Sequence, residues 1–139
     1  MAHLTGNSRA QYVQGMFARI AWRYDMMNRL MTFGQDYFWR NEVIRRAALP
    51  RRGGRLLDLG AGTGDLGRQA LRRHPAILAV EADFTLEMLR AGQARPASQA
   101  LNWSAADALN LPFPADSFDA VVSGFLLRNV IDLPRALAE

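Results

Sequence analysis

The 139-residue sequence predicts an α/β fold, in which a parallel sheet is flanked by helices and preceded by a helical cap. Three observations predict it. Short apolar segments alternate with helix-like segments from residue 55 onward, a glycine-rich turn follows the first of them, and one apolar stripe runs along residues 8–31. Strands that alternate with helices are typical of parallel sheets, because each crossover covers a face of the sheet. We therefore divide the chain into a helical cap over residues 1–50 and an α/β core over residues 51–139.

The cap is predicted to contain two helices. In residues 8–31 the apolar positions recur in steps of three and four, which places them on one stripe of a helix. They are Val13, Phe17, Ile20, Tyr24, Met27 and Met31. The stripe is interrupted at residues 32–34, and a second helix is expected over residues 36–49. Pro50 and Gly53 then mark a break before the core.

The core is predicted to contain four strands and three further helices. Strands are expected over residues 55–59, 77–83, 101–105 and 118–123, and helices over residues 65–73, 85–94 and 133–139. Thr85 is expected at the N-cap of its helix, with Met88 and Leu89 facing inward. A sheet of four strands that stops at this point has an open edge, so we expect it to be incomplete in this chain. We expect either a longer protein or another molecule to complete it.

The composition excludes several kinds of chemistry. All 17 basic residues are arginine, against 13 acidic residues, and there is no cysteine or lysine. Without cysteine, disulfide scaffolds, cysteine-ligated metals and thiol nucleophiles are excluded. Without lysine, imine formation by this chain is excluded as well. We expect no metal site.

The net charge of +4 does not by itself predict a nucleic-acid partner. Arginines are spread along the whole chain, whereas nucleic-acid binders concentrate basic residues on one face. Weak attraction of the basic N-terminal half to an anionic membrane surface is the more useful interpretation. No apolar run is long enough to span a bilayer, and residues 1–9 lack the apolar core of a signal peptide. We therefore expect a cytoplasmic protein with peripheral contact at the inner face of the membrane.

The glycine-rich turn after the first strand is the motif that carries chemistry. A strand, such a turn and a helix form a site for a polar ligand, with donors from the backbone N–H groups and the helix N-terminus. Dinucleotide binders need a third glycine where this chain has Asp65. The run from Asp58 to Gly64, Asp-Leu-Gly-Ala-Gly-Thr-Gly, instead resembles motif I of the class I S-adenosylmethionine (SAM)-dependent methyltransferases, which have a Rossmann-like fold. Within it, Asp58 is expected to be a buried acceptor for the N–H groups of the turn.

Two acidic residues at later strand ends agree with SAM as the cofactor. Asp83 ends the second strand, where a carboxylate accepts hydrogen bonds from both ribose hydroxyls. Asp107 follows the third strand, where a side-chain acceptor meets the adenine amino group. The residues predicted to contact the cofactor are Asp58, Gly60, Gly62, Thr63, Gly64, Asp83, Asp107 and Ala108.

A closer resemblance involves both ends of the chain. Residues 24–32, Tyr-Asp-Met-Met-Asn-Arg-Leu-Met-Thr, followed by Trp39-Arg40, resemble the first signature of the ubiquinone/menaquinone biosynthesis C-methyltransferase family. Residues 109–114, Leu-Asn-Leu-Pro-Phe-Pro, and residues 127–130, Leu-Arg-Asn-Val, resemble a later run of the same family. The sequence departs from the family pattern at Thr32, Asp36, Gly124 and Leu126, where the family has Ser, His, Ser and Gly.

The resemblance implies transfer of a methyl group from SAM to a ring carbon of a reduced polyprenyl quinone. Arg128 is then expected to stabilise a developing phenolate, and Asn129 to orient the ring oxygen. Tyr24 and Asp25 are expected in a lid over the cofactor, with Asp25 accepting the proton. The expected partners are a lipid-soluble quinol, a membrane surface and a second copy of the chain, and no nucleic acid.

Two other functions stay open on the sequence alone. One is a methyltransferase that acts on another small acceptor. The other is a truncated SAM-binding module without turnover, for which the incomplete sheet is the best support. Some residues also have purely structural interpretations: Tyr24 lies on the apolar stripe, and Arg128 is as well suited to pairing with a nearby carboxylate. The sequence does not distinguish a benzoquinone from a naphthoquinone ring.

Overall fold

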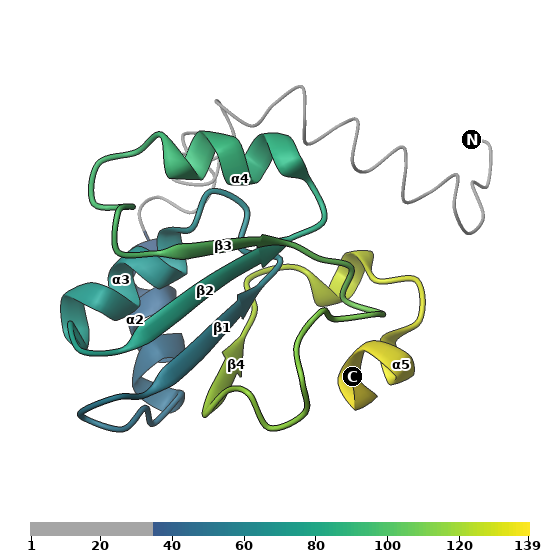
Figure 1. Cartoon of the computed structure of the whole chain (residues 1–139), viewed down its shortest axis with the longest axis horizontal. Helices are drawn as coiled ribbons and strands as arrows, with labels where there is room; N and C mark the ends of the chain where they lie inside the picture. Colours follow the sequence, from purple (N-terminus) through teal and green to yellow (C-terminus); the bar gives the residue numbers. More distant parts are fainter. Residues whose placement is uncertain (1–34) are drawn as a thin grey trace.

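The computed structural model describes residues 35–139, so the predicted first helix, with Tyr24 and Asp25, lies outside the described residues. Figure 1 shows a twisted sheet with helices packed beside it. In chain order the elements are α2 (Asp36–Arg46), β1 (Arg55–Leu59), α3 (Asp65–Arg73), β2 (Leu78–Asp83), α4 (Leu86–Gln93), β3 (Asn102–Ala105), β4 (Ala120–Val122), the 3₁₀ turn η1 (Leu127–Asn129) and α5 (Leu133–Ala138).

The described strands form one parallel sheet in the order β3-β2-β1-β4. The chain moves outward from β1 through β2 to β3 and then returns to the other side of β1 (Figure 1). β1 and β4 therefore flank a switch point, and in open α/β sheets ligands bind outside the carboxyl ends of the strands at such a point. The predicted α/β fold with a parallel sheet is confirmed.

The two faces of the sheet have separate apolar clusters. On one face Leu56, Ala79 and Val122 pack with Ile44 of α2 and Leu66 of α3. On the other face apolar side chains of β1 and β2 pack against the loop between β3 and β4. The strands contribute Leu57, Leu59 and Ala82, and the loop contributes Ala106, Ala108 and the partly buried Leu111, Phe113 and Phe118. Side chains alternate between the faces of a strand, so Asp58 lies on the same face as Leu56, beneath the helices.

Most predicted boundaries agree closely with the structure, and two differ for physical reasons. β1 and α3 have the predicted bounds. α2 ends at Arg46 rather than at residue 49, because Ala48 has a φ of +50° and the position before Pro50 disfavours helical geometry. β4 is limited to Ala120–Val122, because Phe118 turns into the core and stacks edge-on against Phe113 with ring centroids 5.1 Å apart.

The predicted cap contributes directly to the core. Ile44 is completely buried and Leu49 is nearly so, and both belong to the cluster that includes Leu56 of β1. The division at residue 50 stays a prediction. In residues 35–139, none of the helices has the length and apolar character needed to cross a membrane.

Candidate functional site

A cavity of about 540 Å³ lies at the carboxyl ends of the strands. Its volume is typical of small-molecule sites. Most of the residues predicted to contact the cofactor line it, namely Asp58, Gly60, Gly62, Thr63, Asp83, Asp107 and Ala108. Gly64 is not among the lining residues; it lies one position earlier than α3, as its N-cap. The structure thus brings the motifs of three strand ends to one place.

The glycine turn has a backbone that other residues rarely adopt. Gly60 and Gly62 have φ values of +72° and +58°. A Cβ on Gly60 would come within 2.8 Å of the Leu126 Cβ, and one on Gly62 would lie 3.1 Å from the Met88 Cε. Glycine is therefore required both for the turn and for the close approach of its neighbours.

The N–H groups of the turn are engaged within the protein. Gly60 and Ala61 both donate to the Ala82 carbonyl, at 2.8 and 3.0 Å. Gly62 donates to Asp83 Oδ2 at 2.8 Å, and Gly64 donates to the Ala61 carbonyl at 2.9 Å. The expectation that these N–H groups donate to a ligand is therefore wrong for all four. The turn gives a ligand close access to its backbone rather than a set of donors.

Asp83 holds the turn against the start of α4. Its Oδ2 accepts the Gly62 N–H, and its Oδ1 accepts the Thr85 N–H at 2.8 Å. Burial raises the pKa of Asp83, and the hydrogen bonds from Thr85 and Gly62 partly oppose this. Thr85 takes the predicted N-cap position, but its side chain makes no capping hydrogen bond. Met88 and Leu89 are buried, as predicted. Hydroxyl donors of a ligand would share the Asp83 oxygens with the backbone donors of Gly62 and Thr85.

Asp58 does not accept the N–H groups of the turn. It is 1% exposed, and neither of its oxygens has a hydrogen-bond donor among the described residues. Asp83 and the Ala82 carbonyl take the role that the sequence analysis gave to Asp58. Burial raises the pKa of Asp58, and Glu81, the neighbour of Asp58 in the register of β1 and β2, is close enough to affect its protonation.

The loop after β3 provides a third acidic side chain. Asp107 Oδ1 accepts the Leu109 N–H at 2.9 Å, and its carbonyl accepts the Asn110 N–H at 3.0 Å. This compact turn fixes the direction of the Asp107 side chain at the cavity. Ala108 is buried in the core beneath the lining. An aspartate held in this way leaves Oδ2 for an amino group on a ligand.

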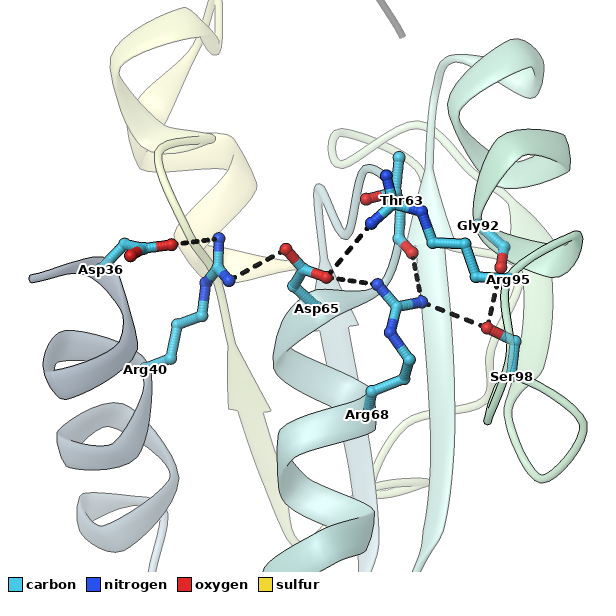
Figure 2. A network of polar contacts seen from close by, with 8 residues as sticks. All are labelled: Asp36, Arg40, Thr63, Asp65, Arg68, Gly92, Arg95 and Ser98. Atoms are coloured by element: carbon cyan, nitrogen blue, oxygen red, sulfur yellow. Dashed lines mark hydrogen bonds and ion pairs between the residues drawn. The ribbon is translucent and has the colours of Figure 1, made fainter. Parts of the chain in front are cut away.

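A network of charged side chains supports the end of the turn (Figure 2). Asp65, the first residue of α3, is contacted by Arg40 at 2.9 Å, by Arg95 at 3.5 Å and by Arg68. Arg40 also pairs with Asp36 at 3.3 Å, one turn earlier in α2. Burial acts to raise the pKa of Asp65, but the three arginines outweigh it and hold the pKa below its ordinary value.

Arg68 extends this network to the cofactor turn. It is 7% exposed and donates to the Thr63 carbonyl at 2.7 Å and to the Ser98 Oγ at 3.1 Å. Ser98 in turn donates to the Gly92 carbonyl of α4 at 2.8 Å. Figure 2 shows these side chains linking α2, α3 and the end of α4. The network thus fixes Thr63, which lines the cavity, relative to three helices.

The two catalytic candidates that follow β4 are placed differently. Asn129 lines the cavity, and its Nδ2 donates to the Phe125 carbonyl at 3.5 Å. Arg128 is exposed and is not among the lining residues; its guanidinium lies 5.2 Å from the centre of the Phe125 ring. The roles predicted for both residues, and for Tyr24 and Asp25 outside the described residues, stay predictions.

The structure also places residues at the cavity that the sequence analysis did not assign to it. Arg40 and Trp39 come from α2, Phe84 follows β2, and Ser123 follows β4 with an Oγ that has no partner among the described residues. Two pairs of opposite charges on predicted helices were signals for the network: Asp36 with Arg40, four residues apart, and Asp65 with Arg68, three residues apart. The positions of Trp39, Phe84 and Ser123 at the cavity depend on how separate elements pack, which the sequence does not show directly.

The chain matches known proteins along nearly its whole length. A model of the ubiE/COQ5 methyltransferase family matches residues 5–139. The chain is 48% identical over 133 residues to the demethylmenaquinone methyltransferase of Roseiflexus castenholzii, which covers 96% of this chain and 56% of that protein. It is 43% identical over 132 residues to the ubiquinone/menaquinone biosynthesis C-methyltransferase UbiE of Desulfotalea psychrophila, covering 95% and 53%. The chain therefore spans about half the length of the curated relatives it matches.

Solved structures confirm the class I methyltransferase fold. A chain in the complex between the Haloferax volcanii Trm112 methyltransferase activator and a methyltransferase matches with a TM-score of 0.71 and 25% identity, covering 87% of this chain and 52% of that chain. A SAM-dependent methyltransferase from Methanococcus maripaludis matches with a TM-score of 0.73 at 18% identity, covering 99% and 60%, which shows the fold alone. From the extent of the family match and the identity to its members, this chain belongs to the ubiE/COQ5 methyltransferase family.

Proposed function

We propose that this chain forms the SAM-binding part of an enzyme that methylates a ring carbon of a reduced polyprenyl quinone. The observation that carries the proposal is one cavity in which three strand-end aspartates, Asp58, Asp83 and Asp107, surround a glycine turn in a chain of this family. The names of the relatives supply the acceptor, a demethylated quinone.

The lining residues fit the nucleoside part of SAM. Asp83 would accept hydrogen bonds from the ribose hydroxyls, sharing its oxygens with the N–H groups of Gly62 and Thr85. Asp107 Oδ2 would accept the adenine amino group. Phe84 is 48% exposed although it lines the cavity, so its ring offers an apolar surface to the adenine.

The charges of the lining favour a cationic ligand over a phosphate. The N–H groups that would cradle a phosphate are already bound to Ala82 and Asp83. Arg40, a basic residue of the lining, is paired with Asp36 and Asp65. The oxygens of Asp58, which have no N–H donor among residues 35–139, lie at the cavity and suit the ammonium and sulfonium groups of SAM.

When bound, SAM supplies a methyl group that its sulfonium has already activated. The chain's own residues then position the acceptor ring and exclude water. Asn129, which lines the cavity, would orient the ring oxygen, and Arg128 would stabilise phenolate charge after turning from Phe125. Asp25, which the sequence predicts in the lid, would accept the phenol proton whose loss makes the ring more nucleophilic.

Apolar side chains at the cavity suit an apolar acceptor. Trp39, Phe125 and Ile131 line the cavity and are each about half exposed. Exposed apolar groups of this size at a site are typical of contact with an apolar ligand or a membrane. They support a polyprenyl quinol as acceptor and peripheral contact with the membrane that dissolves it.

Calorimetric titration of the 139-residue chain with SAM tests the cofactor. We expect binding in the micromolar range or weaker, and Gly62→Val should abolish it by blocking the turn near Met88. Gly53→Val is the matched control, because Gly53 has a φ of +68° but nothing lies within 4 Å of its added Cβ. An absence of SAM binding, or equal loss in both variants, would overturn the assignment.

Conversion of a demethylated quinol to its methylated product by the purified chain tests turnover. Product formation that requires SAM supports the enzyme. SAM binding without turnover of any quinol would favour the module without activity. Turnover of another phenolic acceptor alone would favour the second methyltransferase hypothesis.

A further inference from the structure

Glu81 is a buried acidic side chain that the proposed function does not use. It is fully buried in the middle of β2 and lies opposite Asp58 in the register of β1 and β2. Partners in a parallel register point to the same face, so both carboxyl groups lie beneath α3. None of their four oxygens meets a hydrogen-bond donor among the described residues. Two ionised carboxylates in such a place would be strongly unfavourable.

Helix α3 leaves room for this side chain at one position. A Cβ on Gly67 would lie within 2.8 Å of Glu81 Oε2 and closer still to Oε1 and Cδ. The three atoms nearest to that Cβ all belong to Glu81. A glycine in the interior of a helix costs stability, so its presence opposite a buried glutamate indicates that the space is used. The Glu81 carboxyl group is therefore confined between α3 and Asp58.

Burial and the repulsion between the two carboxylates favour one proton on the pair. Burial and the neighbouring Asp58 raise the pKa of Glu81, and Arg68 opposes this only in part. Burial likewise raises the pKa of Asp58. With one proton, the acid group of one residue donates to the carboxylate of the other, which gives both a partner. The other charged groups that face the pair are Asp83 from β2, Asp65 from α3 and Arg40 from α2.

The geometry also indicates which residue keeps the proton. Asp58 lines the cavity, where a cationic ligand would stabilise its charge, whereas Glu81 is not among the lining residues. We propose that Glu81 is a positioning residue of the cofactor site, whose carboxylic acid group donates a hydrogen bond to the Asp58 carboxylate and fixes it at the cavity. The proposal rests on the proposed function, because its consequence is a fixed negative charge beside the ammonium and sulfonium groups of SAM.

Two variants of Glu81 separate a hydrogen-bond donor from a filler of space. Glu81→Gln keeps the shape and an N–H donor toward Asp58, and Glu81→Met keeps much of the volume without a donor. In calorimetric titration with SAM, Glu81→Gln should bind within twofold of the wild type. Glu81→Met should bind roughly tenfold more weakly, as expected for one hydrogen bond to a charged group. Equal affinity of wild type and Glu81→Met would overturn the proposal.

Infrared spectroscopy of the chain without ligand tests the proton directly. The C=O stretching band of a protonated carboxyl group should be present at neutral pH and lost in Glu81→Gln. The control is Glu87→Gln in the exposed first turn of α4, which should leave the band unchanged. Persistence of the band in Glu81→Gln, or its absence from the wild type, would overturn the proposal even if Glu81→Met does not fold. A wild type that binds no SAM but shows this band would overturn the proposed function alone.

Discussion

Gly67→Ala should change the free energy of unfolding with opposite signs in two backgrounds. In the wild type the new methyl group would meet the oxygens of Glu81 and force that side chain away from Asp58. Overpacking of this kind costs about 1–3 kcal/mol, and a lost hydrogen bond to a charged group costs about 1.5–3 kcal/mol. The gain in helix propensity offsets about 1 kcal/mol. We therefore expect a net destabilisation of about 1.5–5 kcal/mol.

In the Glu81→Ala background the obstacle to Gly67→Ala is gone. No other atom lies as close to the new Cβ as the three of Glu81, so the helix-propensity gain of about 1 kcal/mol should remain. The two substitutions should thus be coupled by about 2.5–6 kcal/mol, at or above the upper end of the range for residues in contact. Urea unfolding followed by circular dichroism measures all four chains of this cycle.

Gly92→Ala in α4 is the matched control for this cycle. Its Cβ would lie 2.6 Å from the Thr63 carbonyl and would also meet Trp103, and neither contact involves Glu81. Its cost should be the same in both backgrounds. If Gly67→Ala also has the same cost in the wild type and in the Glu81→Ala background, the reasoning is refuted. Glycine would then be needed at position 67 for the close packing of α3 on the sheet, and not to make room for the Glu81 carboxyl group.

Three further predictions concern the network and the cavity. Arg68→Met should reduce the free energy of unfolding by about 3 kcal/mol, measured in urea, because it removes the Arg68 donors from the Thr63 carbonyl and the Ser98 Oγ and one of the three arginines from Asp65; a loss below about 1 kcal/mol would contradict this role. Asp65 has a lowered pKa, so its contribution is present at neutral pH and is lost as the pH falls through that value. Thermal unfolding of the wild type should therefore lose more stability than that of Asp65→Asn between about pH 5 and about pH 3, and parallel curves would exclude the effect. Gly124→Ser, which restores the family residue, should leave stability within about 0.5 kcal/mol, because its Cβ would be 3.5 Å from the Leu66 Cδ1, an ordinary contact; a clear drop in melting temperature would count against this packing.

The sequence predicted the elements that have strong local signals. The bounds of β1 and α3 were correct because an apolar run, a glycine turn and an amphipathic helix follow each other without ambiguity. Asp58, Asp83 and Asp107 were found as lining residues because each lies at the end of an apolar run, and parallel strands end at one edge. The short β4 was less predictable, since Phe118 has the composition of a strand residue but packs as a loop anchor.

The partners of these residues depend on register and packing, which local patterns do not determine. Glu81 meets Asp58 only because β2 pairs with β1 in one particular register. A shift of one residue would turn its side chain to the other face. Arg68 reaches Asp65 from three residues along the same helix, whereas Arg40, 25 positions before Asp65 in the sequence, reaches it because α2 packs on α3.

The charge preference of this site follows from where the N–H groups of its turn are used. A strand, a glycine turn and a helix are shared with phosphate-binding folds, where such N–H groups face the ligand. Here the Gly62 N–H is bound by Asp83, the same carboxylate that the ribose would need. The Asp83 side chain thus occupies an N–H group that could bind a phosphate, and it provides an acceptor for a hydroxyl group. With Asp58 fixed beside it, as we propose, the same backbone shape would favour a cationic nucleoside. The side chains that accept hydrogen bonds from the turn, rather than the number of its glycines, would therefore determine which class of ligand binds.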